Sequence, residues 1–203
     1  MVELSETAHD ALTELINIAI GRSAKSLNEM IGQEVSLSVP EIEFLTAGDA
    51  TGKLGTNVSS DMTLVQQGFS GPISGSSFLA FMEDNSFELV KLLLGDQVPI
   101  EDIPELEQEA MKEVGNVILN AFLGSLGNEL DITVASEIPE FKKNASAEQI
   151  FQSPSGNEHI ILFVHVDFDL RDAKIDGYLV LIIGVSAMDA LIGLVEDYVG
   201  KLA

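Results

Sequence analysis

A glutamate followed three residues later by an asparagine occurs twice in this chain. Glu14 precedes Asn17 in the segment A-L-T-E-L-I-N, and Glu113 precedes Asn116 in the segment A-M-K-E-V-G-N. A side-chain amide both donates and accepts hydrogen bonds, so it can hold a water molecule in line with a phosphorus atom without changing its own protonation. A carboxylate one helical turn away could pair with a lysine of a partner and fix the position of the amide. The two pairs are therefore candidates for water-directing chemistry.

A single Glu-x-x-Asn motif carries little information, because both residues are common on solvated helix surfaces. Here the motif recurs at an offset of 99 residues, and eight identities fall among the 31 positions from 11 to 41. Unrelated sequences of average composition would give roughly two. An internal duplication explains the identities. Packing gives no reason for a solvated Glu and Asn to persist while neighbours such as Gly21 and Asn120 diverge, which favours a functional role.

A helix is expected to carry each motif, since successive helical residues are rotated by about 100° and the four motif positions then share a stripe roughly 60° wide. The stripe holds Asp10, Glu14, Asn17 and Gly21 in the first copy, and Glu109, Glu113, Asn116 and Asn120 in the second. The opposite face of the first helix is apolar, which is typical of a helix docked on a core. We expect this helix from Glu6, after Ser5 as N-cap, to about Ile31, and the second from Glu105 to about Leu130.

Each half is expected to continue with three strands and a closing helix. The predicted strands cover residues 34–44, 62–69 and 75–82 in the first half and 132–138, 159–170 and 176–185 in the second. The closing helices are expected near 87–94 and 187–199, and the stretches 46–60 and 141–158 are expected to be loops.

Two such copies related by an approximate dyad predict one α/β domain of the α+β type over residues 1–203. Its pseudo-repeats would be 1–98 and 99–203, sharing one continuous, mostly antiparallel sheet with packed helices. Two independent domains of about 100 residues are the alternative, but each would have an exposed sheet edge.

The charge of the chain limits its partners. With 33 acidic and 10 basic residues the formal net charge is -23, which argues against binding to nucleic acid or to an anionic membrane. Partners should be locally basic or should bring a metal ion. The acidity could also reflect a high-salt cytoplasm rather than ordinary solubility.

The sequence predicts a cytoplasmic protein with no membrane insertion. No apolar run approaches the ~20 residues that span a bilayer, the N-terminus lacks the pattern of a signal peptide, and there is no cysteine for a disulfide. His9, His159 and His165 show no metal-ligand spacing, so we expect neither a metal site nor a cofactor of the protein's own.

The segments E-L-I-N at 14–17 and E-V-G-N at 113–116, each some twenty residues ahead of a V/I-P-E strand, resemble the paired signatures of the CheC-type chemotaxis phosphatases, the CheC/CheX/FliY group. The resemblance covers essentially the whole chain and implies a pseudo-two-fold α/β domain acting on the phosphorylated response regulator CheY. It implies that Asn17 and Asn116 enter the acyl-phosphate site of CheY to position the hydrolytic water, and that Glu14 and Glu113 anchor the lysine of that site. The Mg²⁺ would belong to the phosphorylated regulator.

Two positions depart from the family pattern, which has a Gly just before each Asn and another four residues after it. In the first copy Ile16 stands in place of the glycine before Asn17, whereas Gly21 matches the later glycine. In the second copy Gly115 matches the earlier glycine, whereas Asn120 stands in place of the later one. Because these glycines would let the partner approach, each site is expected to be hindered at a different place. Relatives that bind the receptor deamidase CheD use an extra helical element in the second half, so a CheD partner is not expected from the loop-like stretch 141–158.

Two other functions stay open from the sequence alone. The chain could be a non-catalytic module that binds a response regulator or a flagellar-switch component through the same helix faces, or, less in keeping with the motifs, a metabolite-binding regulatory domain. The decay of phosphorylated CheY in the presence of the protein separates catalysis from binding.

Overall fold

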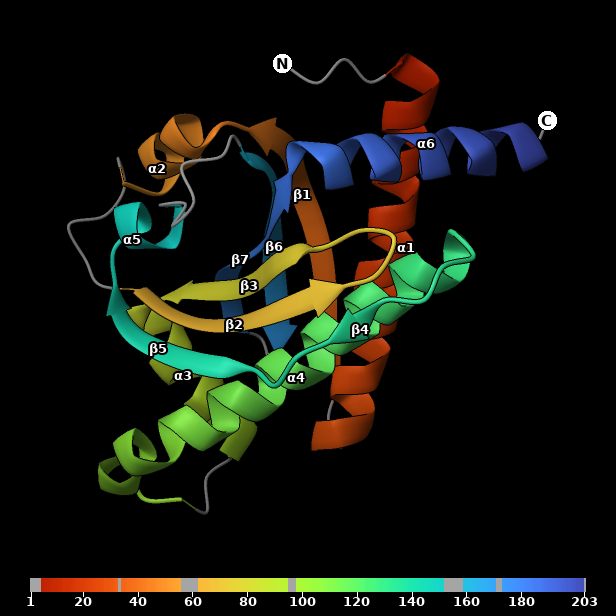
Figure 1. Cartoon of the computed structure of the whole chain (residues 1–203). Coiled ribbons are helices and arrows are strands. Elements are labelled where there is room, and N and C mark those ends of the chain that lie inside the picture. Colours follow the sequence, from red (N-terminus) through yellow and green to blue (C-terminus); the bar gives the residue numbers. More distant parts are fainter. Residues whose placement is uncertain are drawn as a thin grey trace.

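The structure is a computed structural model that describes residues 5–32, 34–55, 62–94, 98–151, 159–170 and 173–202 (Figure 1). Its elements follow in the order α1 (Glu6–Ile31), β1 (Val35–Leu45), α2 (Ala47–Gly55), β2 (Met62–Ser70), β3 (Gly75–Met82), α3 (Glu83–Leu94), η1 (Ile100–Asp102), α4 (Ile103–Glu129), β4 (Ala135–Ser136), β5 (Glu140–Ala145), α5 (Ala147–Phe151), β6 (His159–Leu170), β7 (Ala173–Gly184) and α6 (Val185–Leu202).

Both motif-bearing helices form where the sequence predicts them. The Ser5 hydroxyl caps α1 by accepting a hydrogen bond from the Ala8 amide at 3.2 Å, and α1 ends at Gly32, whose φ of 66° suits a residue without a Cβ. Pro104 lies in the first turn of α4. Its missing N–H costs no hydrogen bond, because backbone N–H groups in the first turn of a helix have no partner within the helix.

The strands form one antiparallel sheet in which the two halves of the chain are interleaved. The order is β1-β6-β7-β3-β2, and both β5 and the short β4 pair with β2. The third strands of the two halves, β3 and β7, meet at the centre of the sheet, with Gly75 opposite Ile183 and Phe81 opposite Gly177. On one side of this central pair, β7 is followed by β6 of its own half and then by β1 of the other half. On the other side, β3 is followed by β2 of its own half and then by β5 of the other half, as an approximate dyad requires. The mixed α/β architecture is as the sequence predicts, whereas the repeat boundaries at 98 and 99 stay a prediction.

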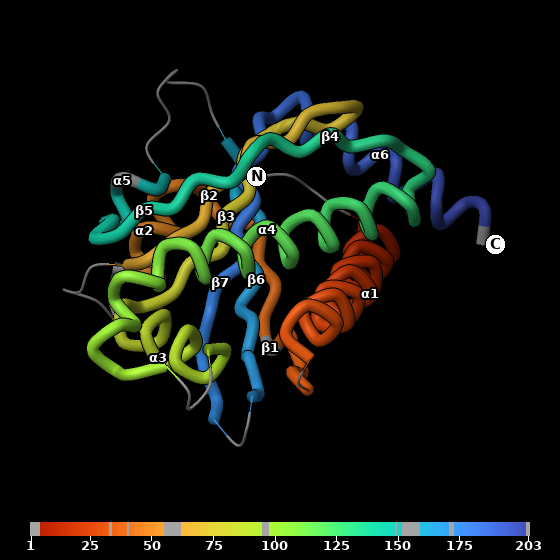
Figure 2. The backbone as a smooth tube through the Cα atoms, turned by 90° about the horizontal axis from the view of Figure 1, so that it is seen from below, coloured from red at the N-terminus to blue at the C-terminus, as the bar shows by residue number. Residues whose placement is uncertain are grey.

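Helices cover both faces of the sheet, as Figures 1 and 2 show. Side chains alternate between the faces along each strand. One set, including Val65, Leu79 and Val164, packs under α1, α4, α3 and α6. The alternate set, including Leu64 and Phe163, packs under the short helices α2 and α5. The motif-bearing helices α1 and α4 lie side by side on the first face, so the sheet fixes both of them from beneath.

Three local predictions are wrong. Residues 47–55 form α2 rather than a loop, because Thr46 and Asp49 make a capping pair in which the Thr46 hydroxyl accepts from the Asp49 amide at 3.2 Å and donates to its carboxylate at 2.7 Å. The stretch 141–158 contains β5 and α5, and its residues 152–158 lie outside the described part, as do residues 56–60 of the first stretch. In 132–138 only Ala135 and Ser136 are strand, and β5 is the counterpart of β1 instead.

Each repeat is therefore helix, strand, short helix, two strands and helix. None of the helices in the described residues combines the length and the apolar character needed to cross a membrane.

Candidate functional site

The first motif lies on the outward surface of α1. Glu14 and Asn17 are both exposed, because the Leu15 side of the helix turns into the core. Gly21, one turn beyond Asn17, is exposed too, and a Cβ built on it would meet no atom within 4 Å. Within the described part of the chain no hydrogen bond ties the Asn17 amide. The first site is thus an open surface with an unrestrained amide.

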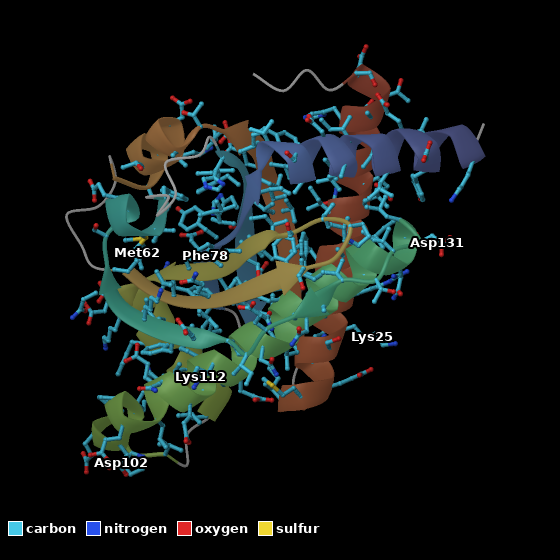
Figure 3. The ribbon with its side chains drawn as sticks, in the orientation of Figure 1. Lys25, Met62, Phe78, Asp102, Lys112 and Asp131 are labelled. Carbon is cyan, nitrogen blue, oxygen red and sulfur yellow. The ribbon has the colours of Figure 1, made fainter. Side chains whose placement is uncertain are left out.

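The second motif lies in an open groove of about 740 Å³ beside α4. The α4 side of this groove is formed by Glu109, Lys112, Glu113, Asn116 and Asn120, and the other side by Gln67 and residues 136–139. Glu113 is exposed and Asn116 is half-buried, so both can be reached from solvent. Lys112, labelled in Figure 3, lies in the first half of α4 and lines this groove.

A chain of hydrogen bonds holds the amide of the second site. Asn120 Nδ2 donates to Asn116 Oδ1 at 2.8 Å, and Gln67 Nε2 donates to Asn120 Oδ1 at 3.2 Å and to the Glu137 carbonyl at 2.7 Å. Gln67 is only 1% exposed, and its Oε1 has no hydrogen-bond partner among the described residues. The buried glutamine therefore fixes Asn120, which in turn fixes Asn116.

The first site lacks this restraint. At the same offset of 99 residues, Gly21 corresponds to Asn120 and Val166 to Gln67, so neither side chain can make the equivalent hydrogen bonds. The two sites present the same Glu and Asn, but one amide is free and the other is held.

The expectation that Ile16 would hinder a docking partner is wrong. Ile16 is fully buried in the core, and its counterpart Gly115 is buried as well, facing Val65 of β2. A Cβ at Gly115 would lie 2.5 Å from the Val65 side chain. The residue before each Asn therefore sets the distance between its helix and the sheet, and does not touch the surface that a partner would meet.

The helices α1 and α4 are fastened to one another, which fixes the relative position of the two sites. Arg22 of α1 donates to the Ser125 hydroxyl at 3.1 Å and to the Glu129 carboxylate at 2.5 Å. The buried Ser23 hydroxyl lies 3.1 Å from the Ile118 carbonyl of α4. Both motif surfaces are acidic, because each Glu-x-x-Asn motif follows a further acid one turn earlier, Asp10 in the first copy and Glu109 in the second. This charge suits a basic group on a partner.

Sequence reasoning missed Gln67 as part of the second site. Its partner Asn120 is 53 residues away, so no local pattern links them. The available signal was a glutamine at a core-facing position of a strand, since a buried amide needs partners. A separate group of possible metal ligands, His165, Asp167 and Asp176, lies on the opposite face of the sheet.

No protein-family model matches the chain, but curated relatives do, and two of them are CheC and FliY. The CheY-P phosphatase CheC of Bacillus subtilis (strain 168) is 21% identical over 173 residues, which is 82% of this chain and 82% of CheC. The flagellar motor switch phosphatase FliY of the same organism is 22% identical over 138 residues, which is 67% of this chain but 34% of FliY. The second relative is thus much longer than the matched region.

A solved structure shares the fold. The crystal structure of Thermotoga maritima FliY aligns over 100% of both chains with a TM-score of 0.73 at 20% identity. This likeness concerns the architecture, and the relatives CheC and FliY add the relationship in sequence. The chain is thus similar in sequence to CheC and FliY and similar in fold to FliY.

Proposed function

We propose that the protein is a phosphatase that hydrolyses the acyl phosphate of a phosphorylated CheY-type response regulator. The observation that carries the proposal is the double presentation of Glu and Asn, with Glu14 and Asn17 exposed on α1 and Glu113 and Asn116 facing the groove beside α4. The relative named CheY-P phosphatase CheC, which matches over 82% of this chain, supports it.

In the proposed reaction the protein needs only to position the attacking water. An aspartyl phosphate is already reactive, and its Mg²⁺ comes with the regulator as part of the substrate. Asn17 or Asn116 would hold the attacking water by donating one hydrogen bond and accepting another. Neither general acid nor general base is needed, and placing the water would lower the barrier by a few kcal/mol, on the order of 10- to 1,000-fold in rate.

The glutamates would supply binding and register. Glu14 and Glu113 each lie one helical turn before the Asn, so a lysine of the regulator that pairs with the carboxylate would bring the phosphoryl group towards the amide. The charge of -23 would help association with a basic surface and would make it weaken as salt rises.

The test follows the phosphoryl signal of a CheY-type regulator in the presence of the full chain. The wild-type protein should speed the decay, the single variants Asn17→Ala and Asn116→Ala should each slow it, and the double variant should return it to the rate of the regulator alone. Glu14→Gln and Glu113→Gln should weaken binding more than they alter the rate at saturation. Lys25→Ala, on α1 and exposed, is a matched control that should change neither.

A non-catalytic binding module is the second candidate. The hydrogen bond from Asn120 Nδ2 to the side-chain Oδ1 of Asn116 favours it for the second site, because an engaged amide is less available to a water. The match to the flagellar motor switch phosphatase FliY also makes a switch component a reasonable partner. Measurable binding of the phosphorylated regulator with unchanged decay in the same assay would establish binding alone.

A further inference from the structure

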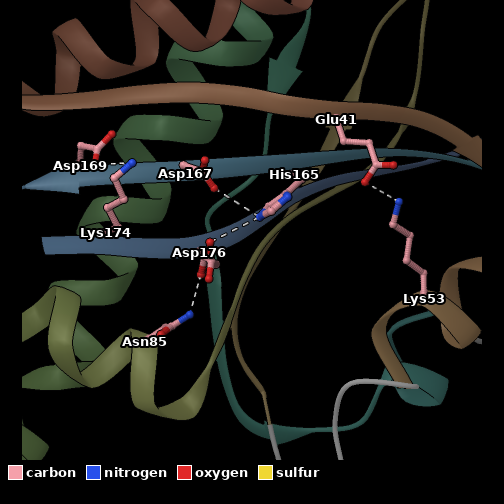
Figure 4. A network of polar contacts seen from close by, with 8 residues as sticks. All are labelled: Glu41, Lys53, Asn85, His165, Asp167, Asp169, Lys174 and Asp176. Carbon is pink, nitrogen blue, oxygen red and sulfur yellow. Dashed lines mark hydrogen bonds and ion pairs between the residues drawn. The ribbon is translucent and has the colours of Figure 1, made fainter.

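The β6–β7 hairpin brings three possible metal ligands together on the face of the sheet that carries α2 and α5. His165 and Asp167 lie on β6, and Asp176 lies on β7 (Figure 4). Asp167 and Asp176 are directly opposite in the ladder, and His165 is opposite Tyr178. The sequence spacing gave no hint of this group, because only the register of the hairpin makes residue 176 a neighbour of residues 165 and 167.

The distances within the group suit a small divalent ion. Nε2 of His165 is 3.4 Å from Oδ1 of Asp167 and 3.6 Å from Oδ1 of Asp176, and the three ligand atoms lie within 4.8 Å of one another. Ligand atoms around a tetrahedral zinc ion, with bonds of about 2.0–2.1 Å, are roughly 3.3 Å apart. Small side-chain rotations would complete such a site.

A bound cation would balance the two negative charges of this group. Like charges directly opposite in an antiparallel pair are destabilising, and Asp167 faces Asp176. Among the described residues no Lys or Arg pairs with either carboxylate, since Lys174 of the same hairpin pairs with Asp169. Nε2 of His165 lies within ion-pair distance of both, and this atom is buried and makes no hydrogen bond in the described part of the chain, although the side chain as a whole is 26% exposed.

The ligands are held by their surroundings, which lowers the cost of binding. The Tyr178 ring stacks on the imidazole of His165, with centroids 5.2 Å apart and planes 24° apart. Asn85 of α3 donates to the Asp176 carbonyl at 3.0 Å and so fixes the β7 backbone (Figure 4). Glu41, opposite His165 on β1, is paired with Lys53 at 2.7 Å and is not available to the group.

We propose that His165, Asp167 and Asp176 bind a divalent transition-metal ion of the zinc class. An imidazole nitrogen favours zinc, cobalt or nickel, whereas magnesium and calcium prefer an all-oxygen site. Three protein ligands leave one tetrahedral position for a water or for a group of a partner. The ion would cross-link β6 and β7 on the face of the sheet away from Asn17 and Asn116. The site is therefore separate from the Mg²⁺ carried by a phosphorylated regulator.

The test is a titration of the EDTA-treated full chain with Zn²⁺, followed by calorimetry and thermal melting, and with Co²⁺, followed by its visible absorption. The wild-type chain should bind one ion and melt at a higher temperature. Each of the variants His165→Gln, Asp167→Asn and Asp176→Asn should weaken binding at least roughly tenfold, since even changes in residues that only support metal ligands cost that much.

Asp169→Asn is the matched control, because Asp169 is the next acid along the same face of β6 and pairs with Lys174. It should bind the ion as the wild type does. Metal-free Asp167→Asn should melt no lower than the metal-free wild type, since it removes a like-charge contact, which separates loss of binding from loss of fold. Absence of any melting shift with Zn²⁺, or equal binding by His165→Gln, would overturn the proposal and leave the proposed phosphatase untouched.

Discussion

At the scale of single residues, the two motif copies differ in the freedom of the amide. Asn17 is exposed and has Gly21 one turn beyond it, whereas Asn116 is half-buried and accepts a hydrogen bond from Asn120. An amide that must steer a water needs its acceptor and donor directed at that water. In the first copy no hydrogen bond among the described residues competes for the amide, whereas in the second the amide oxygen already accepts from Asn120.

The difference predicts unequal contributions to the proposed phosphatase activity. Asn17→Ala should lower the rate of regulator dephosphorylation more than Asn116→Ala. In the Asn17→Ala background, Asn120→Gly should raise the residual rate by up to about fivefold, because a hydrogen bond of about 1 kcal/mol no longer holds the amide of Asn116. Single-turnover decay of the phosphorylated regulator measures both effects. A rate that survives Asn17→Ala and disappears in Asn116→Ala would show instead that the held amide is the better placed one.

At the scale of elements, the position before each Asn controls how closely its helix lies on the sheet. Gly115→Ala should destabilise the protein by about 1–3 kcal/mol, because the added methyl group would overlap the Val65 side chain. Gly124→Ala on the same helix is the control, since its Cβ would meet nothing within 4 Å and Ala is the better helix former. Urea unfolding followed by circular dichroism measures both. Equal stability of the two variants would contradict the packing role of Gly115.

Elements with strong local patterns could be predicted from the sequence, and contacts that depend on long-range pairing could not. The strands predicted at 62–69, 75–82 and 159–170 agree with the structure to within a residue. The glycines of 47–55 suggested a loop, although Thr46 and Asp49 already formed a helix-capping pattern. The Gln67–Asn120 contact and the grouping of residue 176 with residues 165 and 167 depend on tertiary pairing, which spacing along the chain does not reveal.

At the scale of the whole molecule, the halves are joined by more than the sheet. Lys143 of β5 donates to the Glu107 carboxylate of α4 at 2.7 Å and lies 3.5 Å from the Glu83 carboxylate of α3. Glu107 is only 3% exposed and also accepts a hydrogen bond from Ser86 of α3 at 2.9 Å. One cation from the second half thus ties α4 to the closing helix of the first half, next to the start of the helix that carries Asn116.

This cluster predicts how stability depends on pH. The hydrogen bond to Glu107 raises the pKa of Lys143 above its ordinary value of about 10.5, with further raising by the charges of Glu107 and Glu83 and a partly opposing effect of burial. A raised pKa means that the folded state binds the proton more tightly than the unfolded chain, so the contribution is complete below about pH 10 and is lost as the pH rises through the folded-state pKa.

Lys143→Gln should therefore lower the free energy of unfolding by about 1–2 kcal/mol near pH 7. This is less than a fully buried pair would lose, because the lysine side chain is 39% exposed and solvent screens it. The difference from wild type should persist to about pH 10 and shrink above it. Lys142→Gln is the matched control, since the polar contacts of the neighbouring Lys142 with described residues are to Gln66 and, at 4.0 Å, to Glu140. Urea unfolding across this pH range measures both variants. If the loss of unfolding free energy in Lys143→Gln grew with pH, the assigned pairing would be contradicted, because a neutral lysine contributes less to the pairing than a charged one.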